Sequence, residues 1–219
     1  MKEDAGSLGQ RVFHTIREDI LSGKYNKNEE LKEKTIGEEL GVSRTPVREA
    51  LRQLELEGLV TIIPNKGAYV VGFSREDMHD IYEIRSVLEG LCAKRAALHA
   101  KPEQLEALEE IMCLSDFQLQ REHYDQLVEL DNRFHEQMYL ASQSKILAHV
   151  LSDYHHYVER ARKVTLVVPK RSTESNEEHR RILEALKERD AEKAEKMAHQ
   201  HIMNTLKNFD SYGWENECF

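Results

Sequence analysis

The 219-residue sequence contains no long hydrophobic run and only three cysteines. No apolar stretch approaches the roughly 18 residues that a membrane-spanning helix needs, and the polar N-terminus MKEDAGSLGQ does not resemble a signal peptide. Cys92, Cys113 and Cys218 are widely spaced and form no CxxC pair, which argues against a disulfide scaffold and against a cysteine zinc site. We therefore expect reduced thiols and a cytoplasmic protein.

An excess of basic charge is also missing. The formal net charge is −9, which is unfavourable for nucleic-acid binding because such a surface must neutralise phosphates. Residues 1–72 hold 11 Lys and Arg against 12 Asp and Glu, whereas residues 73–219 hold 20 against 28. The acidic excess therefore lies in the second part of the chain. Any DNA contact by the first part must come from a local cluster of basic side chains.

The chain length favours two domains of roughly 100 residues each, and 40% hydrophobic residues are enough to build their cores. The pattern changes at Ser74, which opens a capping box with Asp77, and almost everything beyond it follows a 3.6-residue period. We predict a mainly α protein with a domain over 1–73 and an all-helical bundle over 74–219. The bundle is expected to have about six helices, over 75–100, 102–121, 123–142, 144–167, 173–188 and 190–209.

The first domain has the pattern of a winged helix-turn-helix. Apolar residues at helical spacing predict short helices over 8–22 and 33–40, and a third helix that starts at the capping residue Ser43 and ends near Gly58. Two β-prone runs, LVTIIP and GAYVVG, flank residues 64–67 and predict a hairpin. A hairpin directly after a helix-turn-helix is a wing.

Basic and hydroxyl side chains gather where such a domain reads DNA. Arg44 and Arg48 lie four residues apart near the start of the third helix, with Thr45 beside them. The N-terminal residues of a recognition helix enter the major groove, where arginine binds guanine edges and hydroxyls bind phosphates. Lys34 and Lys66 extend the same surface. For any one arginine, the alternative is a solvated charge paired with a neighbouring glutamate.

The run Leu40-Gly-Val-Ser-Arg-Thr-Pro-Val-Arg-Glu-Ala-Leu51, followed by Glu57-Gly-Leu-Val60 and the wing Lys66-Gly67, resembles the DNA-binding domain of the GntR superfamily. The resemblance covers residues 8–72. It implies that the operator contacts are Lys34, Arg44, Thr45, Arg48, Lys66 and Gly67. One departure is Ile36-Gly37, where the family usually has Leu-Ala.

Three of the eleven histidines, His135, His179 and His201, lie on apolar helix faces in the second domain. Asp131 precedes His135 by one turn. Buried imidazoles and carboxylates need partners, and these four side chains can share one divalent metal ion, with zinc or nickel favoured by nitrogen-rich ligands. The alternative is that each histidine is an ordinary core residue with a hydrogen-bond partner.

The pattern Asp131-x-x-x-His135, Glu178-His179-x-x-Ile182-Leu183 and His201 also resembles the FCD ligand-binding domain of FadR-type GntR regulators. This resemblance covers residues 74–209. It implies that Asp131, His135, His179 and His201 hold a divalent metal, that an organic or sugar acid binds at that metal, and that the protein is a homodimer on a palindromic operator.

Arg85 is the candidate for binding the acid. It shares an apolar stripe with Ile81, Leu88 and Cys92, so its guanidinium points inward, where it can bind a carboxylate through two hydrogen bonds. An internal ion pair with Glu89 is the alternative.

The resulting prediction is a transcription regulator, a repressor, that binds DNA and responds to a small carboxylate. A metal-dependent hydrolase is the rival, because Asp with three His can activate water, although no second acid–base motif such as HExxH accompanies them. A third reading keeps the regulator and makes the metal structural or itself the signal.

Overall fold

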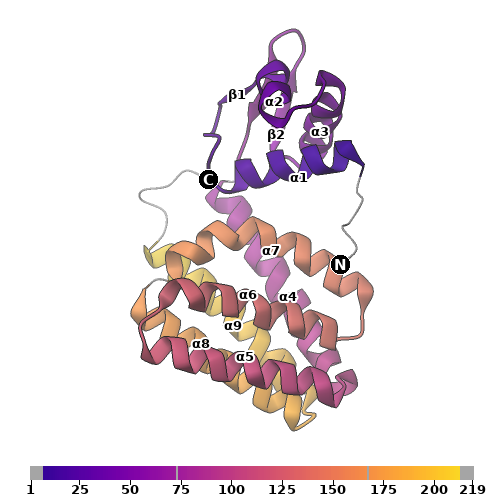
Figure 1. Ribbon diagram of the computed structural model, residues 1–219. Coiled ribbons are helices and arrows are strands. Elements are labelled where there is room, and N and C mark those ends of the chain that lie inside the picture. The colour runs from indigo at the N-terminus through magenta and orange to yellow at the C-terminus, as the bar shows by residue number, and fades with distance from the viewer. Residues whose placement is uncertain (1–6, 73, 167, 213–219) are drawn as a thin grey trace. The chain divides into compact units, whose positions relative to one another are not determined.

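A computed structural model describes residues 7–72, 74–166 and 168–212 of the chain (Figure 1). The chain divides into two compact units, with the boundary between Glu76 and Asp77. Within the described residues, no helix combines the length and the apolar character needed to cross a membrane.

The first unit is a winged helix-turn-helix, as predicted. Its elements are α1 (Leu8–Leu21), β1 (Glu30–Leu31), α2 (Glu33–Leu40), α3 (Arg44–Leu56), β2 (Val60–Ile63) and β3 (Gly67–Val70). The three strands form an antiparallel sheet in the order β1-β3-β2, with Val60 opposite Val70 and Leu31 opposite Ala68. The two-residue strand β1 was not expected, because so short a segment carries no periodicity and is defined only by its pairing with β3.

Apolar faces of α1 and α3 form the core of this unit. The side chains that they bury are Val12, Phe13, Ile16 and Ile20 on α1 and Val47, Ala50, Leu51 and Leu54 on α3. The turn between α2 and α3 depends on two glycines. Gly41 has φ +66°, and a Cβ on Gly37 would lie 2.9 Å from the carbonyl oxygen of Val42. Glycine therefore fits this tight turn, at the position where the family usually has alanine.

The second unit is all-helical over its described residues. Its helices are α4 (Arg75–His99), α5 (Pro102–Gln120), α6 (Tyr124–Ala141), α7 (Lys145–Thr165), α8 (Pro169–Lys187) and α9 (Ala191–Tyr212). The six helices match the predicted ones, but α8 begins four residues earlier than expected and α9 ends three residues later. Pro169 opens that helix and does not interrupt it, because a proline in the first turn loses no intrahelical hydrogen bond.

The core of the second unit gathers residues from α4 through α9. Small residues on α4 allow the other helices to approach it closely, and α4 crosses their general direction in Figure 1. A Cβ on Gly90 would lie 3.1 Å from the carbonyl oxygen of Glu195, so α4 and α9 are nearly in backbone contact there. This packing brings α4, α6, α8 and α9 around one buried polar cluster.

Candidate functional site

The start of α3 presents the predicted DNA contacts to solvent. Arg44, Thr45 and Arg48 are all exposed. Ser43 occupies the N-cap position of α3, but its hydroxyl makes no capping hydrogen bond. The first backbone N–H groups of the helix are therefore not capped by that side chain, and such groups bind phosphate well.

Arg48 is held by Glu33 at the start of α2. Its Nε and an Nη each donate to one carboxylate oxygen of Glu33, and both donor–acceptor distances are 2.7 Å. This hydrogen-bonded pair raises the pKa of Arg48 and lowers the pKa of Glu33. The predicted alternative of an ion pair is thus present, although the partner comes from another helix. Arg52, which sequence reasoning passed over, is exposed one turn beyond Arg48 on the same face.

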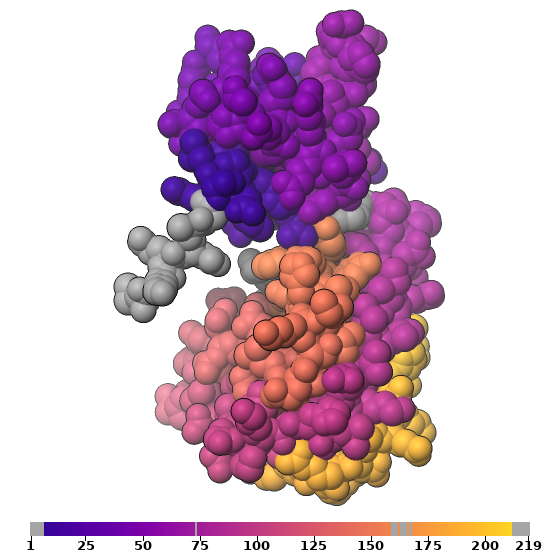
Figure 2. All heavy atoms as spheres, turned by 90° about the vertical axis from the view of Figure 1, so that its right-hand side faces the viewer, coloured from indigo at the N-terminus to yellow at the C-terminus, as the bar shows by residue number. Residues whose placement is uncertain are grey.

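The wing and α2 supply the other predicted contacts. The β2–β3 hairpin projects from the surface of the first unit (Figure 2), and Lys66 and Gly67 are exposed on it. Gly67 has φ +121°, a conformation that side chains disfavour, and a Cβ there would lie 3.1 Å from Glu30. Lys34 is exposed on α2, 3.7 Å from Glu38.

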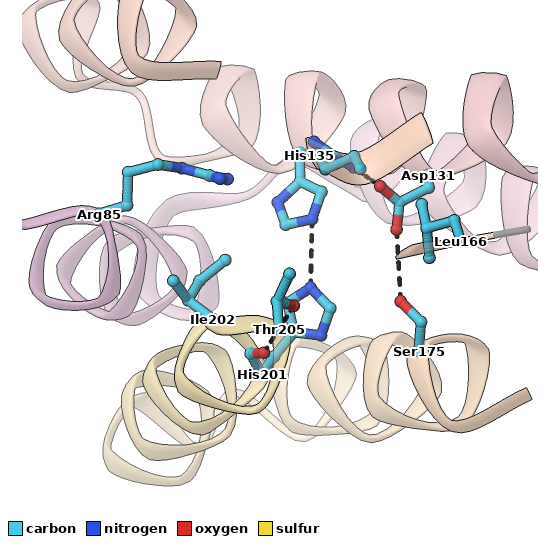
Figure 3. A pocket seen from close by; sticks show the side chains of 9 residues that line it. Arg85, Asp131, His135, Leu166, Ser175, His201, Ile202 and Thr205 are labelled. Atoms are coloured by element: carbon cyan, nitrogen blue, oxygen red, sulfur yellow. Dashed lines mark hydrogen bonds and ion pairs between the residues drawn. The ribbon is translucent and has the colours of Figure 1, made fainter. Parts of the chain in front are cut away.

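In the second unit the structure brings together all four predicted metal ligands. Asp131 and His135 come from α6, His179 from α8 and His201 from α9, and all are buried. The Nε2 atoms of the three histidines are 3.2–3.3 Å apart, and Asp131 Oδ1 is 3.5 Å from His179 Nε2. Figure 3 shows the rings of His135 and His201 facing each other beside Asp131.

Two carboxylates set the direction of two of these rings. Glu89 accepts a hydrogen bond from Nδ1 of His135, and Glu178 accepts one from Nδ1 of His201. Both donor–acceptor distances are 2.7 Å. A proton on Nδ1 leaves a lone pair on Nε2. The lone pairs of His135 and His201 therefore point toward a common centre, where they repel each other unless a cation lies between them.

This donor set fits a divalent transition metal. Ligand nitrogens at about 2.1 Å from Zn²⁺ with tetrahedral angles are about 3.4 Å apart, close to the observed separations. Burial, followed by the charge that the neighbouring histidines would carry, lowers the pKa of His179 and His201 well below the usual value. Both imidazoles are therefore neutral at pH 7, the form that binds metal. Carboxylates behind two ligands are the usual support of a metal-bound histidine.

Arg85, the predicted effector contact, is in an ion pair and also faces a cavity. It donates a hydrogen bond to Glu89, which also accepts one from Tyr139 Oη at 2.8 Å. The same arginine lines a small cavity with His135 and His201. Figure 3 shows its guanidinium extending from α4 toward His135. The two sequence-based alternatives for Arg85 are therefore compatible.

Two further arginines at the cluster were missed by sequence reasoning. Arg171 on α8 donates hydrogen bonds to Glu178 at 3.0 Å and to Thr205 Oγ1 at 2.9 Å. These two bonds hold Glu178 against His201. Arg162 on α7 contacts Asp131 and donates to His155. Burial, together with the charge of Arg85, lowers the pKa of Arg162 to about 9.

A signal for Arg162 exists in the sequence, because it continues a stripe along α7. Leu151, His155, Val158, Arg162 and Leu166 recur at helical spacing and all are buried. His155 was set aside on sequence grounds because its apolar neighbours are less consistent than those of the three chosen histidines. Which inward-facing polar side chains share a site depends on how α7 packs against α6 and α9, and periodicity does not provide that information.

Two small cavities, of about 10 and 20 Å³, lie beside the cluster. Asp131, Leu166 and Ser175 line both of them. Arg85 and Arg162 line the first, and His179 lines the second. Each has room for about one water molecule. A larger ligand therefore needs side chains to move.

Comparison with family models finds two matches along the chain. Residues 8–70 match the family described as bacterial regulatory proteins, gntR family, and residues 80–204 match the FCD domain. The first match spans the winged helix-turn-helix, and the second spans all four candidate metal ligands.

Curated relatives match over nearly the full length. The HTH-type transcriptional regulator YdhC of Bacillus subtilis is 28% identical over 210 residues, covering 94% of each chain. The HTH-type transcriptional repressor RspR of Escherichia coli is 26% identical over 209 residues, covering 95% of this chain and 92% of the relative. Among solved structures, E. coli McbR/YncC has the same fold, with a TM-score of 0.74 at 22% identity over 94% of this chain and 98% of that chain.

Proposed function

We propose that this chain, which belongs to the gntR family of bacterial regulatory proteins and carries an FCD domain, is a repressor that binds a palindromic operator and senses a small carboxylate at a metal ion. It is a transcription regulator and not an enzyme, because the families and relatives that it matches are transcription regulators. The hydrolase alternative is therefore set aside. Repression is supported by RspR and by the gluconate operon transcriptional repressor of Bacillus subtilis, which is 32% identical over 130 residues.

Operator binding is assigned to the exposed side chains of the first unit. Arg44, Thr45 and Arg48 would lie in the major groove, with Arg48 exchanging one hydrogen bond to Glu33 for one to a base or phosphate. Lys66 and Gly67 on the wing and Lys34 on α2 would contact the flanking backbone. In this arrangement Glu33 keeps the Arg48 fork extended before DNA arrives.

Metal sensing is assigned to Asp131, His135, His179 and His201, with zinc or nickel as the ion. The observation that carries this proposal is the convergence of three buried Nε2 atoms within 3.3 Å of one another, two of them directed by Glu89 and Glu178. The metal would supply an open coordination position for one carboxylate oxygen. Arg85 is positioned to bind the same ligand.

The test begins with operator DNA selected from a random-sequence pool by the metal-replete protein. Its affinity is then measured with metal present, after chelation, and with a panel of organic and sugar acids. We expect one metal per chain and a change in operator affinity when both the metal and an active acid are present. Enrichment of no DNA sequence would contradict operator binding. A change on chelation alone, with no acid active, would favour the metal as the signal.

The dimer is assigned to the outer face of α4. Ile84, Val87, Leu91 and Leu98 form one stripe on α4 and are 40–64% exposed, whereas the opposite face of α4 lies in the core. A helix that is apolar on both faces is normally covered on both. A second copy, packed through the same stripe, would provide that cover and would bring two recognition helices onto one palindrome.

The dimer is tested with Val87→Glu, which places a charge at the centre of the stripe. Sedimentation should show a shift from dimer to monomer. Ile146→Glu, which changes an even more exposed apolar residue at the start of α7, is the matched control and should remain a dimer. A dimeric Val87→Glu protein would assign the interface elsewhere.

A further inference from the structure

Three buried guanidinium groups surround the candidate metal site, and each contacts a carboxylate. Arg85, Arg162 and Arg171 are at most 3% exposed. Their partners are Glu89, Asp131 and Glu178 respectively. Among the described side chains around the cluster, three positive and three negative charges therefore balance while the histidines are neutral.

A bound metal changes this balance. The ligand imidazoles remain neutral on a metal, so a divalent ion adds two positive charges to a buried region that was already neutral. Buried charge without a counter-charge is strongly unfavourable. Glu89 and Glu178 stay hydrogen-bonded to their histidines and arginines. Only the Asp131 carboxylate would therefore change partners.

Asp131 is the one carboxylate shared between an arginine and the metal. Its Oδ1 faces His179 and the hydroxyl of Ser175, whereas its other oxygen contacts Arg162. Once the metal draws on the Asp131 charge, Arg162 loses most of its counter-charge while still buried beside Arg85. The most direct compensation is an anionic group brought by the ligand.

We propose that the metal-loaded site takes a dianionic ligand, a dicarboxylate, with one carboxylate at the metal and the second bound by Arg162. This inference rests on the proposed metal-dependent sensing and narrows its ligand. Guanidinium binds carboxylate through two parallel hydrogen bonds, so Arg162 supplies geometry as well as charge. The cavities are too small for such a ligand, which therefore enters only as side chains move: Leu166, which lines both cavities, and Arg162, which lines the first.

The proposal is tested with matched pairs of acids that differ only in the second carboxylate: malonate with propionate, succinate with butyrate, and glutarate with valerate. Each is titrated into the Zn²⁺-loaded full-length protein by calorimetry. In at least one pair we expect the dicarboxylate to bind at least about 10-fold more tightly, since a hydrogen bond to a charged group contributes about 1.5–3 kcal/mol. Equal affinity within every pair overturns the dianion while leaving carboxylate sensing intact. Binding of none of the six acids counts against the sensing proposal itself and removes this one with it.

Arg162→Gln separates the role of this arginine from that of the metal ligands. Removing a positive charge beside Asp131 should raise Zn²⁺ affinity several-fold, whereas the preference for the dicarboxylate should fall to less than about 3-fold. A merely structural role for Arg162 would weaken both. Arg180→Gln, which removes an exposed partner of Asp116 on the same unit, is the matched control and should change neither value.

Two further outcomes decide the proposal if Arg162→Gln does not fold. Arg162→Lys keeps the charge without the fork and should retain a reduced preference for the dicarboxylate, and a full loss of preference with unchanged Zn²⁺ affinity would contradict a charge-based role. Inorganic phosphate provides the other arm, because it concentrates its negative charge in one group. Phosphate binding more tightly than every dicarboxylate would overturn the two-ended arrangement.

Discussion

The two units of this chain carry their candidate sites in opposite ways. The winged helix-turn-helix presents Arg44, Arg48 and Lys66 on its surface, within segments that are close in sequence. The helical unit buries its site, with ligands drawn from α6, α8 and α9. Exposed side chains of the first kind contribute little to stability, so they can be replaced without unfolding the protein. Buried polar side chains of the second kind support the fold and the function together.

Replacing His179 should have the largest effect and tests the buried side of this contrast. His179 is 3% exposed and stacks on Phe134, with ring centroids 4.3 Å apart. His179→Ala should lower Zn²⁺ affinity by at least about 100-fold, since losing even a partner behind a metal ligand costs 10–100-fold. It should also lower the melting temperature of the metal-free protein. Calorimetry and metal analysis measure both effects.

His199→Ala is the control for that variant, because His199 lies on α9 and is exposed. It should keep one metal per chain and an unchanged melting temperature. Full metal occupancy in His179→Ala would remove this histidine from the ligand set.

Replacing Arg44 and Arg48 together tests the exposed side. Each bidentate arginine contact to a base contributes about 1–3 kcal/mol, so the double alanine variant should lose about 30-fold or more of its affinity for the selected operator. Its melting temperature should stay within about 2 °C of the wild type, because neither side chain is buried. Arg181→Ala, an exposed arginine of the helical unit, should bind the operator normally. Unchanged affinity in the double variant would disprove the DNA assignment.

The pH dependence of stability should follow the buried unit. His155, His179 and His201 have pKa values lowered by burial, so below about pH 6.5 the unfolded chain binds more protons than the folded one. The metal-free protein should therefore be most stable above that pH and lose stability as the pH falls, by up to about 1.4 kcal/mol per pH unit for each histidine.

Denaturant unfolding of chelated protein between pH 7.5 and 5.5 measures this slope. His179→Gln should have a shallower slope than the wild type, because one proton-binding difference is removed. A slope that does not change in this variant would show that His179 is protonated equally in the folded and unfolded chain.

The smallest effect is expected at Gly37 in the first unit. A Cβ there would lie 2.9 Å from the Val42 carbonyl oxygen, so Gly37→Ala should lower the free energy of unfolding by about 1 kcal/mol. Gly9→Ala on α1 is the matched control, because a Cβ at that position meets nothing closer than 3.6 Å. It should be neutral or stabilising, as alanine normally is in a helix. A stabilised Gly37→Ala protein would show that the turn adapts.

Local patterns in the sequence were sufficient to predict nearly all the helices, the wing and the four candidate metal ligands. Helical periodicity reports which side faces inward, and thus it identified His135, His179 and His201, although it missed the buried His155 on α7. Where a rule concerned a single residue it was less secure. Pro169 was expected to separate helices, yet it opens α8, because the same residue both breaks a helix and starts one.

The sequence alone determined the two-part architecture, the helix that follows the helix-turn-helix turn and the inward direction of the four candidate metal ligands, since all of these depend on neighbours within a few residues. Only the tertiary structure decided which inward side chains meet. The pairs Glu89–His135, Glu178–His201 and Asp131–Arg162 each join two different helices. The two residues of each pair are 23 to 46 positions apart in the sequence. Their distances depend on helix packing, in which small residues such as Gly90 set how closely the backbones approach.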